Sequence, residues 1–264
     1  MSSSALSFGH FMPSGWVLDL DGVVWVGQTP VPGAAEAVER LRRSGASVVF
    51  VTNLSALTVA EQEARLAGCG IDAAGLVVTS ATAAGRLIHP GERVLVVGGS
   101  GIVEAVELAG AEVCSSEAVD AVIVGIDPGF DYNALGRAMR AVRGGARLIG
   151  TNHDPSYPTE AGLEPGGGAL LAAVAAAAEA VPTMAGKPNQ PVVECVRDRM
   201  GDTGVVVGDR PDSDGRFAQA LGYEFALVLS GVTSADDLPV SPEPQYQARD
   251  LVELVDRMGI QPLG

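Results

Sequence analysis

Lysine is almost missing from this chain: of its 17 basic residues, Lys187 is the single lysine and the others are arginines. Basic residues are also outnumbered by 32 acidic ones, which gives a formal net charge of −15. Nucleic-acid-binding proteins need a positive surface, so this balance argues against that class of partner. Arginine occupies every other basic position. We therefore expect position 187 to need the compact ammonium group of lysine, which the larger, planar guanidinium of arginine would not replace.

Cysteine and histidine are scarce as well, at three residues each. The cysteines, Cys69, Cys114 and Cys195, lie far apart and form no CxxC pair. This odd, scattered count fits a protein with neither a disulfide framework nor a zinc site. The composition favours a reduced protein of the cytoplasm.

Long apolar runs are missing too. The most membrane-like stretch, 169–181, contains Glu179 and is shorter than the roughly 20 residues that a membrane-spanning helix needs. Residues 1–15 lack the basic start and the apolar core of a signal peptide. We therefore expect no membrane contact and a buried helix at 169–181.

Apolar runs of strand length alternate instead with amphipathic stretches of helix length. Helices are predicted at 33–45 and at 58–70, the second opening on a capping box of Thr58 and Glu61. Continuous Val/Ile/Leu strands between helices are typical of a doubly wound, Rossmann-like α/β fold with a parallel sheet. The predicted strands are 16–21, 47–52, 93–98, 121–126, 147–152, 204–209 and 224–231.

Polar residues stand where several of these strands end, which is where such sheets bind ligands. They are Asp19 and Asp21 after the first strand, Thr52 and Asn53 after the second, Asp209 after the sixth, and Lys187 in the loop before the helix that leads to it. Each feature alone is ordinary turn or cap chemistry. Together they predict a shared site in which a divalent cation offsets the clustered carboxylates.

The ordered motifs DLDGV, TN, GKP and GDRPDSD resemble those of the haloacid dehalogenase (HAD) superfamily. GDRPDSD is similar to the form found in subfamily IIA, the NagD-like branch with p-nitrophenyl phosphatases and phosphoglycolate phosphatases. Two positions depart from the branch: Leu54 replaces the usual second asparagine of TNNS, and Gly215 replaces an apolar residue.

Spacing agrees with that branch. Thirty-one residues separate Asp21 from Thr52, whereas 135 separate Thr52 from Lys187, far more than one crossover needs. The resemblance implies that 88–183 is an inserted α/β cap domain and that 1–87 and 184–264 form a discontinuous catalytic core. It also suggests a homodimer formed through the cap.

The resemblance assigns a metal site to the acidic residues. Mg²⁺ is expected to bind the carboxylate of Asp19, the backbone carbonyl of Asp21 and the carboxylate of Asp209, with Asp214 in support. Hard oxygen ligands of this kind suit that ion.

The resemblance also assigns the chemistry. Asp19 is expected to attack phosphorus and form an aspartyl-phosphate, while Asp21 protonates the leaving alkoxide and then activates water. Thr52 and Lys187 are expected to bind the phosphoryl oxygens. Asn53 is expected to contribute to substrate binding.

The presence of Asp21 favours a phosphatase, because dehalogenases of the superfamily lack this residue and its P-type ATPases replace it with threonine. The familiar mutases insert their cap before the second motif, where this chain has no room. Small phosphorylated metabolites are the expected substrates, with the individual compound open. Tyr157, in the loop 151–168, stands where relatives vary with substrate and is either a substrate contact or a packing residue.

Two other functions are suggested by parts of the sequence. The stretch 93–113 has the strand, glycine turn and helix of a dinucleotide site, which would make the protein an NAD-binding oxidoreductase. Glu104 stands where that motif needs its third glycine, and a carboxylate there would repel a pyrophosphate. The other alternative is a non-catalytic ligand-binding protein on a HAD fold, which the retained charged motif residues disfavour.

Overall fold

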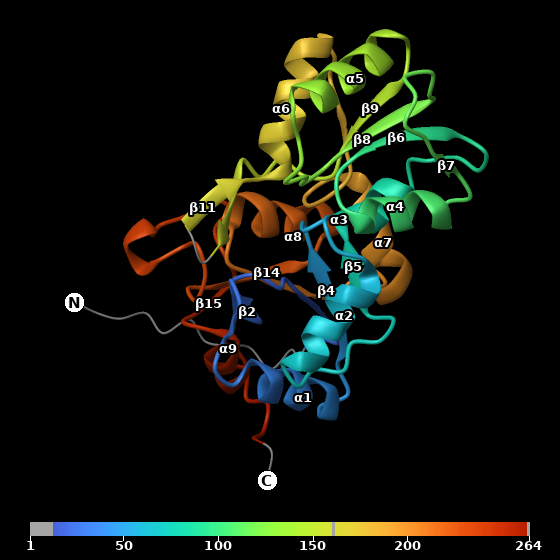
Figure 1. Cartoon of the computed structure of the whole chain (residues 1–264). Coiled ribbons are helices and arrows are strands. Elements are labelled where there is room, and N and C mark those ends of the chain that lie inside the picture. Colours follow the sequence, from blue (N-terminus) through green and yellow to red (C-terminus); the bar gives the residue numbers. More distant parts are fainter. Residues whose placement is uncertain (1–12, 160–161, 263–264) are drawn as a thin grey trace. The chain divides into compact units, whose positions relative to one another are not determined.

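The computed structural model describes residues 13–159 and 162–262. The N-terminal stretch 1–15 lies mostly outside these residues, as do positions 160–161 of the predicted cap and 263–264 of the predicted core. The chain divides into two compact units, 1–49 with 202–264 and 50–201. Both contain parallel strands covered by helices, which confirms the predicted α/β class (Figure 1).

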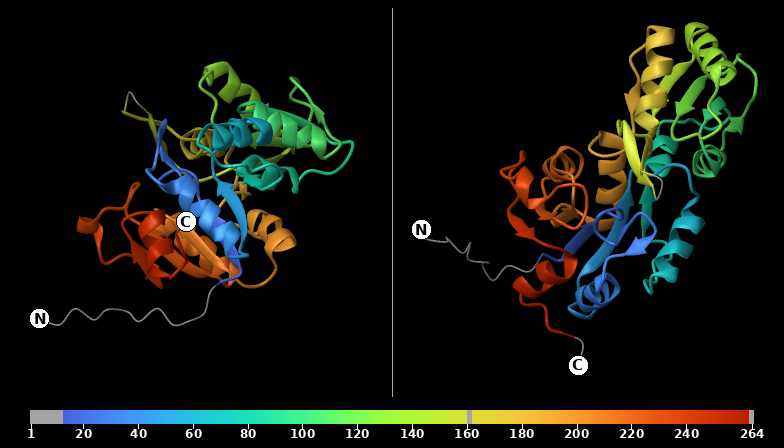
Figure 2. Two further views of the ribbon diagram at one scale, coloured as in Figure 1. Left: turned by 90° about the horizontal axis from the view of Figure 1, so that it is seen from below. Right: turned by 60° about the vertical axis from the view of Figure 1, so that its left-hand side comes forward.

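The first unit is built on buried, valine-rich strands that pair in parallel. Leu18 of the first strand lies opposite Val207, so that the ends of these two strands meet. Helices α1 and α9 pack side by side (Figures 1 and 2). The elements are β1 (Gly15–Leu18), β2 (Trp25–Val26), β3 (Thr29–Pro30), α1 (Ala34–Arg43), β13 (Val205–Gly208), η1 (Pro211–Gly215), α8 (Arg216–Leu221), β14 (Glu224–Val228), η2 (Ala235–Asp237), β15 (Tyr246–Ala248) and α9 (Leu251–Arg257).

Strand β4 (Ser47–Thr52) is divided between the two units, and the larger sheet has the order β15-β14-β13-β1-β4-β5. The predicted first strand, 16–21, is too long at its end. The paired residues end at Leu18, and the Asp19 amide makes a last bond to the Val207 carbonyl at 2.9 Å. The chain then turns at Gly22, whose φ of 82° suits glycine. The amide of Gly22 donates to the Trp25 carbonyl at 2.7 Å and closes this turn.

The second unit holds a five-stranded parallel sheet of order β12-β9-β8-β6-β7. The predicted capping box at Thr58 and Glu61 is present at the start of α2. The remaining elements are α2 (Val59–Gly68), β5 (Val77–Thr79), α3 (Ser80–Gly85), β6 (Arg93–Val97), α4 (Ser100–Leu108), β7 (Glu112–Val113), β8 (Ala121–Val124), α5 (Tyr132–Arg143), β9 (Arg147–Gly150), β10 (Ser156–Thr159), β11 (Gly162–Pro165), α6 (Gly167–Ala178), β12 (Thr183–Met184) and α7 (Gln190–Met200).

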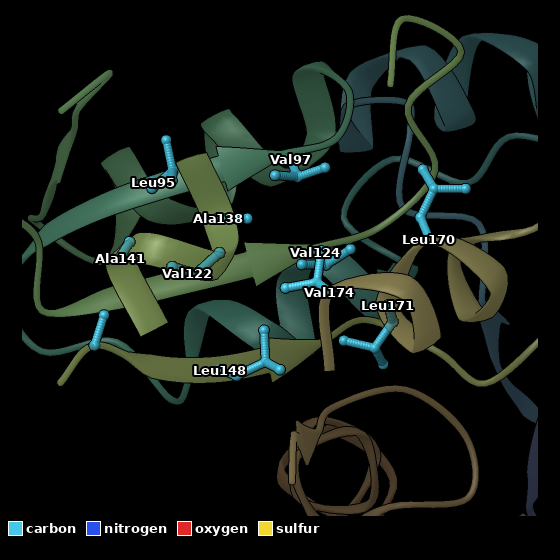
Figure 3. Close-up of a cluster of buried hydrophobic side chains, with 11 residues drawn as sticks. Leu95, Val97, Val122, Val124, Ala138, Ala141, Leu148, Leu170, Leu171 and Val174 are labelled. Carbon is cyan, nitrogen blue, oxygen red and sulfur yellow. The ribbon is translucent and has the colours of Figure 1, made fainter. Parts of the chain in front are cut away.

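A hydrophobic cluster fixes α5 and α6 on one face of this five-stranded sheet. Alternate residues of the strands, such as Val122 and Val124, point toward side chains of the two helices (Figure 3). The helices contact each other along their length (Figure 2, right). Leu171 and Val174 of α6 are buried in the cluster, so the apolar run predicted as a buried helix is one.

Along residues 13–159 and 162–262, every helix is too short or too polar to reach across a bilayer. Within the second unit, α3 packs against both α4 and α7. The cap at 88–183 remains a prediction.

Candidate active site

The first unit gathers three of the predicted acidic residues. Asp19 follows β1, Asp209 follows β13, and Asp214 lies in the short helix η1. One carboxylate oxygen from each residue lies within 4.8 Å of those from the other two. Their exposed fractions are 8%, 2% and 0%, so the cluster is buried.

Three buried carboxylates this close repel one another, and burial opposes their charge. Backbone amides supply part of the compensation: Arg210 donates to Asp214 Oδ2 at 3.1 Å, and Val232 donates to Asp209 Oδ2 at 2.5 Å. The all-oxygen donor set fits a hard divalent cation such as Mg²⁺.

The carboxylate of Asp21 accepts a hydrogen bond from a neighbouring side chain. The indole Nε1 of Trp25 donates to Asp21 Oδ1 at 3.1 Å. Trp25 is 1% exposed, so its ring is a fixed support. A second support comes from Ser230, whose hydroxyl donates to the Gly22 carbonyl at 2.6 Å. The sequence analysis did not predict a role for Trp25 or Ser230. For Trp25 a signal was present, because this residue lies only four positions after Asp21.

The second unit holds the remaining predicted residues. Thr52 ends β4, is buried, and accepts a bond from the Leu54 amide at 3.0 Å through its hydroxyl oxygen. A hydroxyl that accepts can still donate, so this bond leaves Thr52 able to donate to an oxygen ligand. Lys187 is 4% exposed, and its Nζ lies 3.5 Å from the Val51 carbonyl oxygen.

Asn53 contacts the Lys187 loop directly. Its side-chain Oδ1 accepts from the Lys187 amide at 2.9 Å, and its Nδ2 donates to Asp154 Oδ2 at 3.2 Å. The structure thus brings Thr52, Asn53 and the Lys187 loop together within this unit, and it adds Asp154, which sequence reasoning did not single out.

The sequence matches known families of hydrolases in two regions. Residues 16–112 match the haloacid dehalogenase-like hydrolases, and residues 184–254 match a second HAD-hydrolase-like family. A D-glycerol 3-phosphate phosphatase from Mycobacterium tuberculosis is 37% identical over 251 residues, covering 90% of this chain and 70% of the relative. An acid sugar phosphatase from Staphylococcus epidermidis is 33% identical over 244 residues, covering 89% and 94%. The chain belongs to the haloacid dehalogenase-like hydrolases.

Solved structures of HAD-like hydrolases have the same fold. A glycerol phosphate phosphatase from Mycobacterium tuberculosis, solved in complex with magnesium, matches with a TM-score of 0.85 at 35% identity. The match covers 92% of this chain and 76% of that one. The predicted family and the predicted enzyme class, a phosphoric monoester hydrolase, are confirmed by these relatives.

Tyr157 of this HAD-like hydrolase lies in a hairpin, where a loop was expected. Strands β10 and β11 pair antiparallel, with Tyr157 opposite Glu164. The Tyr157 hydroxyl donates to Glu164 Oε2 at 3.3 Å. Desolvation raises the pKa of this hydroxyl, and the Glu164 carboxylate raises it further. The ring is thus oriented by a cross-strand partner.

The glycine turn of 98–101 has a packing role in the HAD-like chain. A Cβ on Gly99 would collide with the Ala56 carbonyl, and one on Gly101 with the Leu57 carbonyl. The carboxylate of Glu104 accepts a bond from the Val59 amide at 2.8 Å. Backbone from the loop after Thr52 therefore packs directly against this glycine turn. The relatives named above are phosphatases, which argues against the oxidoreductase alternative.

Proposed function

We propose that the protein is a Mg²⁺-dependent phosphatase that hydrolyses small phosphorylated metabolites through an aspartyl-phosphate on Asp19. The observation that carries the proposal is the buried cluster of Asp19, Asp209 and Asp214, whose oxygens lie within 4.8 Å of one another. Magnesium in the structure of a relative supports the choice of ion.

In the proposed mechanism, Asp19 attacks phosphorus and the bond from phosphorus to the leaving oxygen breaks. Asp21, held by Trp25, gives its proton to the leaving alkoxide and then takes one from the water that hydrolyses the aspartyl-phosphate. Thr52 and Lys187 donate to the phosphoryl oxygens. A bound Mg²⁺, held by Asp19, Asp209, Asp214 and the Asp21 carbonyl, would offset negative charge on the phosphoryl group.

We further propose that short polyol and sugar phosphates are the substrates. The names of two relatives, a D-glycerol 3-phosphate phosphatase and an acid sugar phosphatase, support this choice. The proposed cap at 88–183 would exclude large substrates when closed, and the net charge of −15 adds repulsion toward polyanions. A cytoplasmic location and a homodimer through the cap remain predictions.

The test is phosphate release from a panel of compounds. It contains both enantiomers of glycerol 3-phosphate, hexose phosphates, phosphoglycolate, nucleoside monophosphates, pyridoxal phosphate and a phosphoprotein. We expect Mg²⁺-dependent turnover that EDTA abolishes, with small polyol or sugar phosphates leading. No turnover of any compound with Mg²⁺ would overturn the function, and a phosphoprotein turned over as well as the best metabolite would overturn the size selection.

A further inference from the structure

Both polar atoms of the Asn53 side-chain amide form hydrogen bonds within the second unit. Oδ1 accepts the Lys187 amide at 2.9 Å, and Nδ2 donates to Asp154 Oδ2 at 3.2 Å. A weaker contact at 3.5 Å joins Nδ2 to the Lys187 carbonyl. The side chain therefore bridges the loop that carries Lys187 and the loop that carries Asp154.

The backbone of Asn53 is tied down as well. Its carbonyl accepts the Ser80 hydroxyl at 2.7 Å and the Asn152 side-chain amide at 2.8 Å. Ser80 is fully buried and Asn152 is 2% exposed, so these donors are rigid supports. Asn152 Oδ1 also accepts the Asp154 amide at 3.0 Å, which orients Asp154 toward Asn53.

Gly186, immediately before Lys187, leaves room for this bridge. A Cβ at this position would lie 2.6 Å from Asn53 Oδ1 and 2.8 Å from the Ser80 Cβ. The Gly186 amide donates to the Thr151 carbonyl at 2.8 Å. The two loops thus meet at Asn53, with glycine required by the close approach.

We infer that Asn53 and Asp154 are positioning residues, which hold the loop of Lys187 so that its ammonium is placed for catalysis. Asp154 accepts a charge-assisted bond, fixes the Asn53 amide plane, and thereby aims Oδ1 at the Lys187 amide. The inference rests on the proposed role of Lys187. It gives Asn53 a different task from the substrate contact that its motif suggests.

Placement of this kind matters because a displacement of about 1 Å at a catalytic group can cost about a hundredfold in rate. A buried lysine on a shifted loop cannot reach the same position by changing rotamer, since its surroundings are packed. Loss of the bridge should therefore lower kcat, while contacts that bind substrate alone would act on KM.

The test compares Asn53→Ala, Asp154→Ala, the double variant and Asp154→Asn. His153→Ala, at an exposed neighbour in the same loop, is the matched control. Kinetics are measured on p-nitrophenyl phosphate with saturating Mg²⁺, and thermal unfolding checks the fold. Amide hydrogen exchange at Lys187, measured by NMR without substrate, reports on the bridge itself.

We expect Asn53→Ala and Asp154→Ala each to lower kcat by about tenfold or more with KM within about twofold. The double variant should be no worse than Asn53→Ala, and Asp154→Asn, which keeps an acceptor, should recover to within about threefold of the parent. The Lys187 amide should exchange faster in Asn53→Ala and stay protected in His153→Ala.

Two results would overturn the inference. One is a raised KM in Asn53→Ala with kcat and Lys187 protection unchanged, which would mark Asn53 as a substrate ligand. The other is simple additivity of the two alanine variants. If the parent protein releases no phosphate, the proposed function fails. The exchange measurement needs no substrate, so it still shows whether Asn53 protects the Lys187 amide.

Discussion

A single methyl group at Gly22 should disable the acidic cluster. Gly22 has a φ of 82°, and a Cβ built on it would lie 2.5 Å from Oδ2 and 2.8 Å from Cβ of Asp209. Non-bonded carbon atoms settle at about 3.5–4.0 Å, so Asp209 must move by about 1 Å in Gly22→Ala. A shift of that size predicts a loss of about a hundredfold in kcat/KM, or about 2.7 kcal/mol.

Gly27→Ala is the matched control for this substitution. Gly27 also has a positive φ, 59°, but a Cβ there meets nothing within 4 Å. Both variants should lose about 1–2 kcal/mol of stability from the backbone conformation. The assay is kcat/KM on p-nitrophenyl phosphate beside thermal unfolding. If Gly22→Ala keeps kcat/KM within about threefold of Gly27→Ala, crowding of Asp209 does not matter and the reasoning is refuted.

Three other substitutions test individual roles. Asp19→Asn should abolish turnover in a folded protein because the amide is not a nucleophile, and near-normal turnover would refute the covalent mechanism. Lys187→Arg should lose most of kcat/KM, since a forked guanidinium does not fit a site that is 4% exposed; arginine serving within about twofold, or about 0.4 kcal/mol, would refute a special need for lysine. Tyr157→Ala should reorder kcat/KM across small phosphates while Mg²⁺ dependence stays, and an unchanged ranking would show that the ring only packs.

Regular elements were predictable because their signals are local. The helix predicted at 33–45 is α1, and the strand predicted at 47–52 matches β4 at both ends. The strand predicted at 16–21 ran too far because its apolar pattern continues through Leu20, beyond the last paired residue. The hairpin of β10 and β11 was missed because its proline and glycine residues are typical of loops.

The motif residues were predictable, but several of their supports were not. Asp154 lies 101 residues from Asn53, and the Asn53–Lys187 bond joins residues 134 apart. No local pattern encodes such contacts, which depend on how separate loops fold together. Trp25 lies only four residues after Asp21, so its contact is local. It was not predicted because a tryptophan beside a strand is ordinarily a packing residue.

The single lysine of this chain, Lys187, is 4% exposed, which affects how lysine-directed reagents label the protein. Any modification of a lysine side chain in this sequence is a modification of Lys187. This applies to acylating reagents, to amine crosslinkers and to acetylation. The burial of that amine means that it reacts only when its surroundings open. A lysine-directed reagent therefore acts as a probe of this loop, and a substrate bound to the ammonium should slow its reaction.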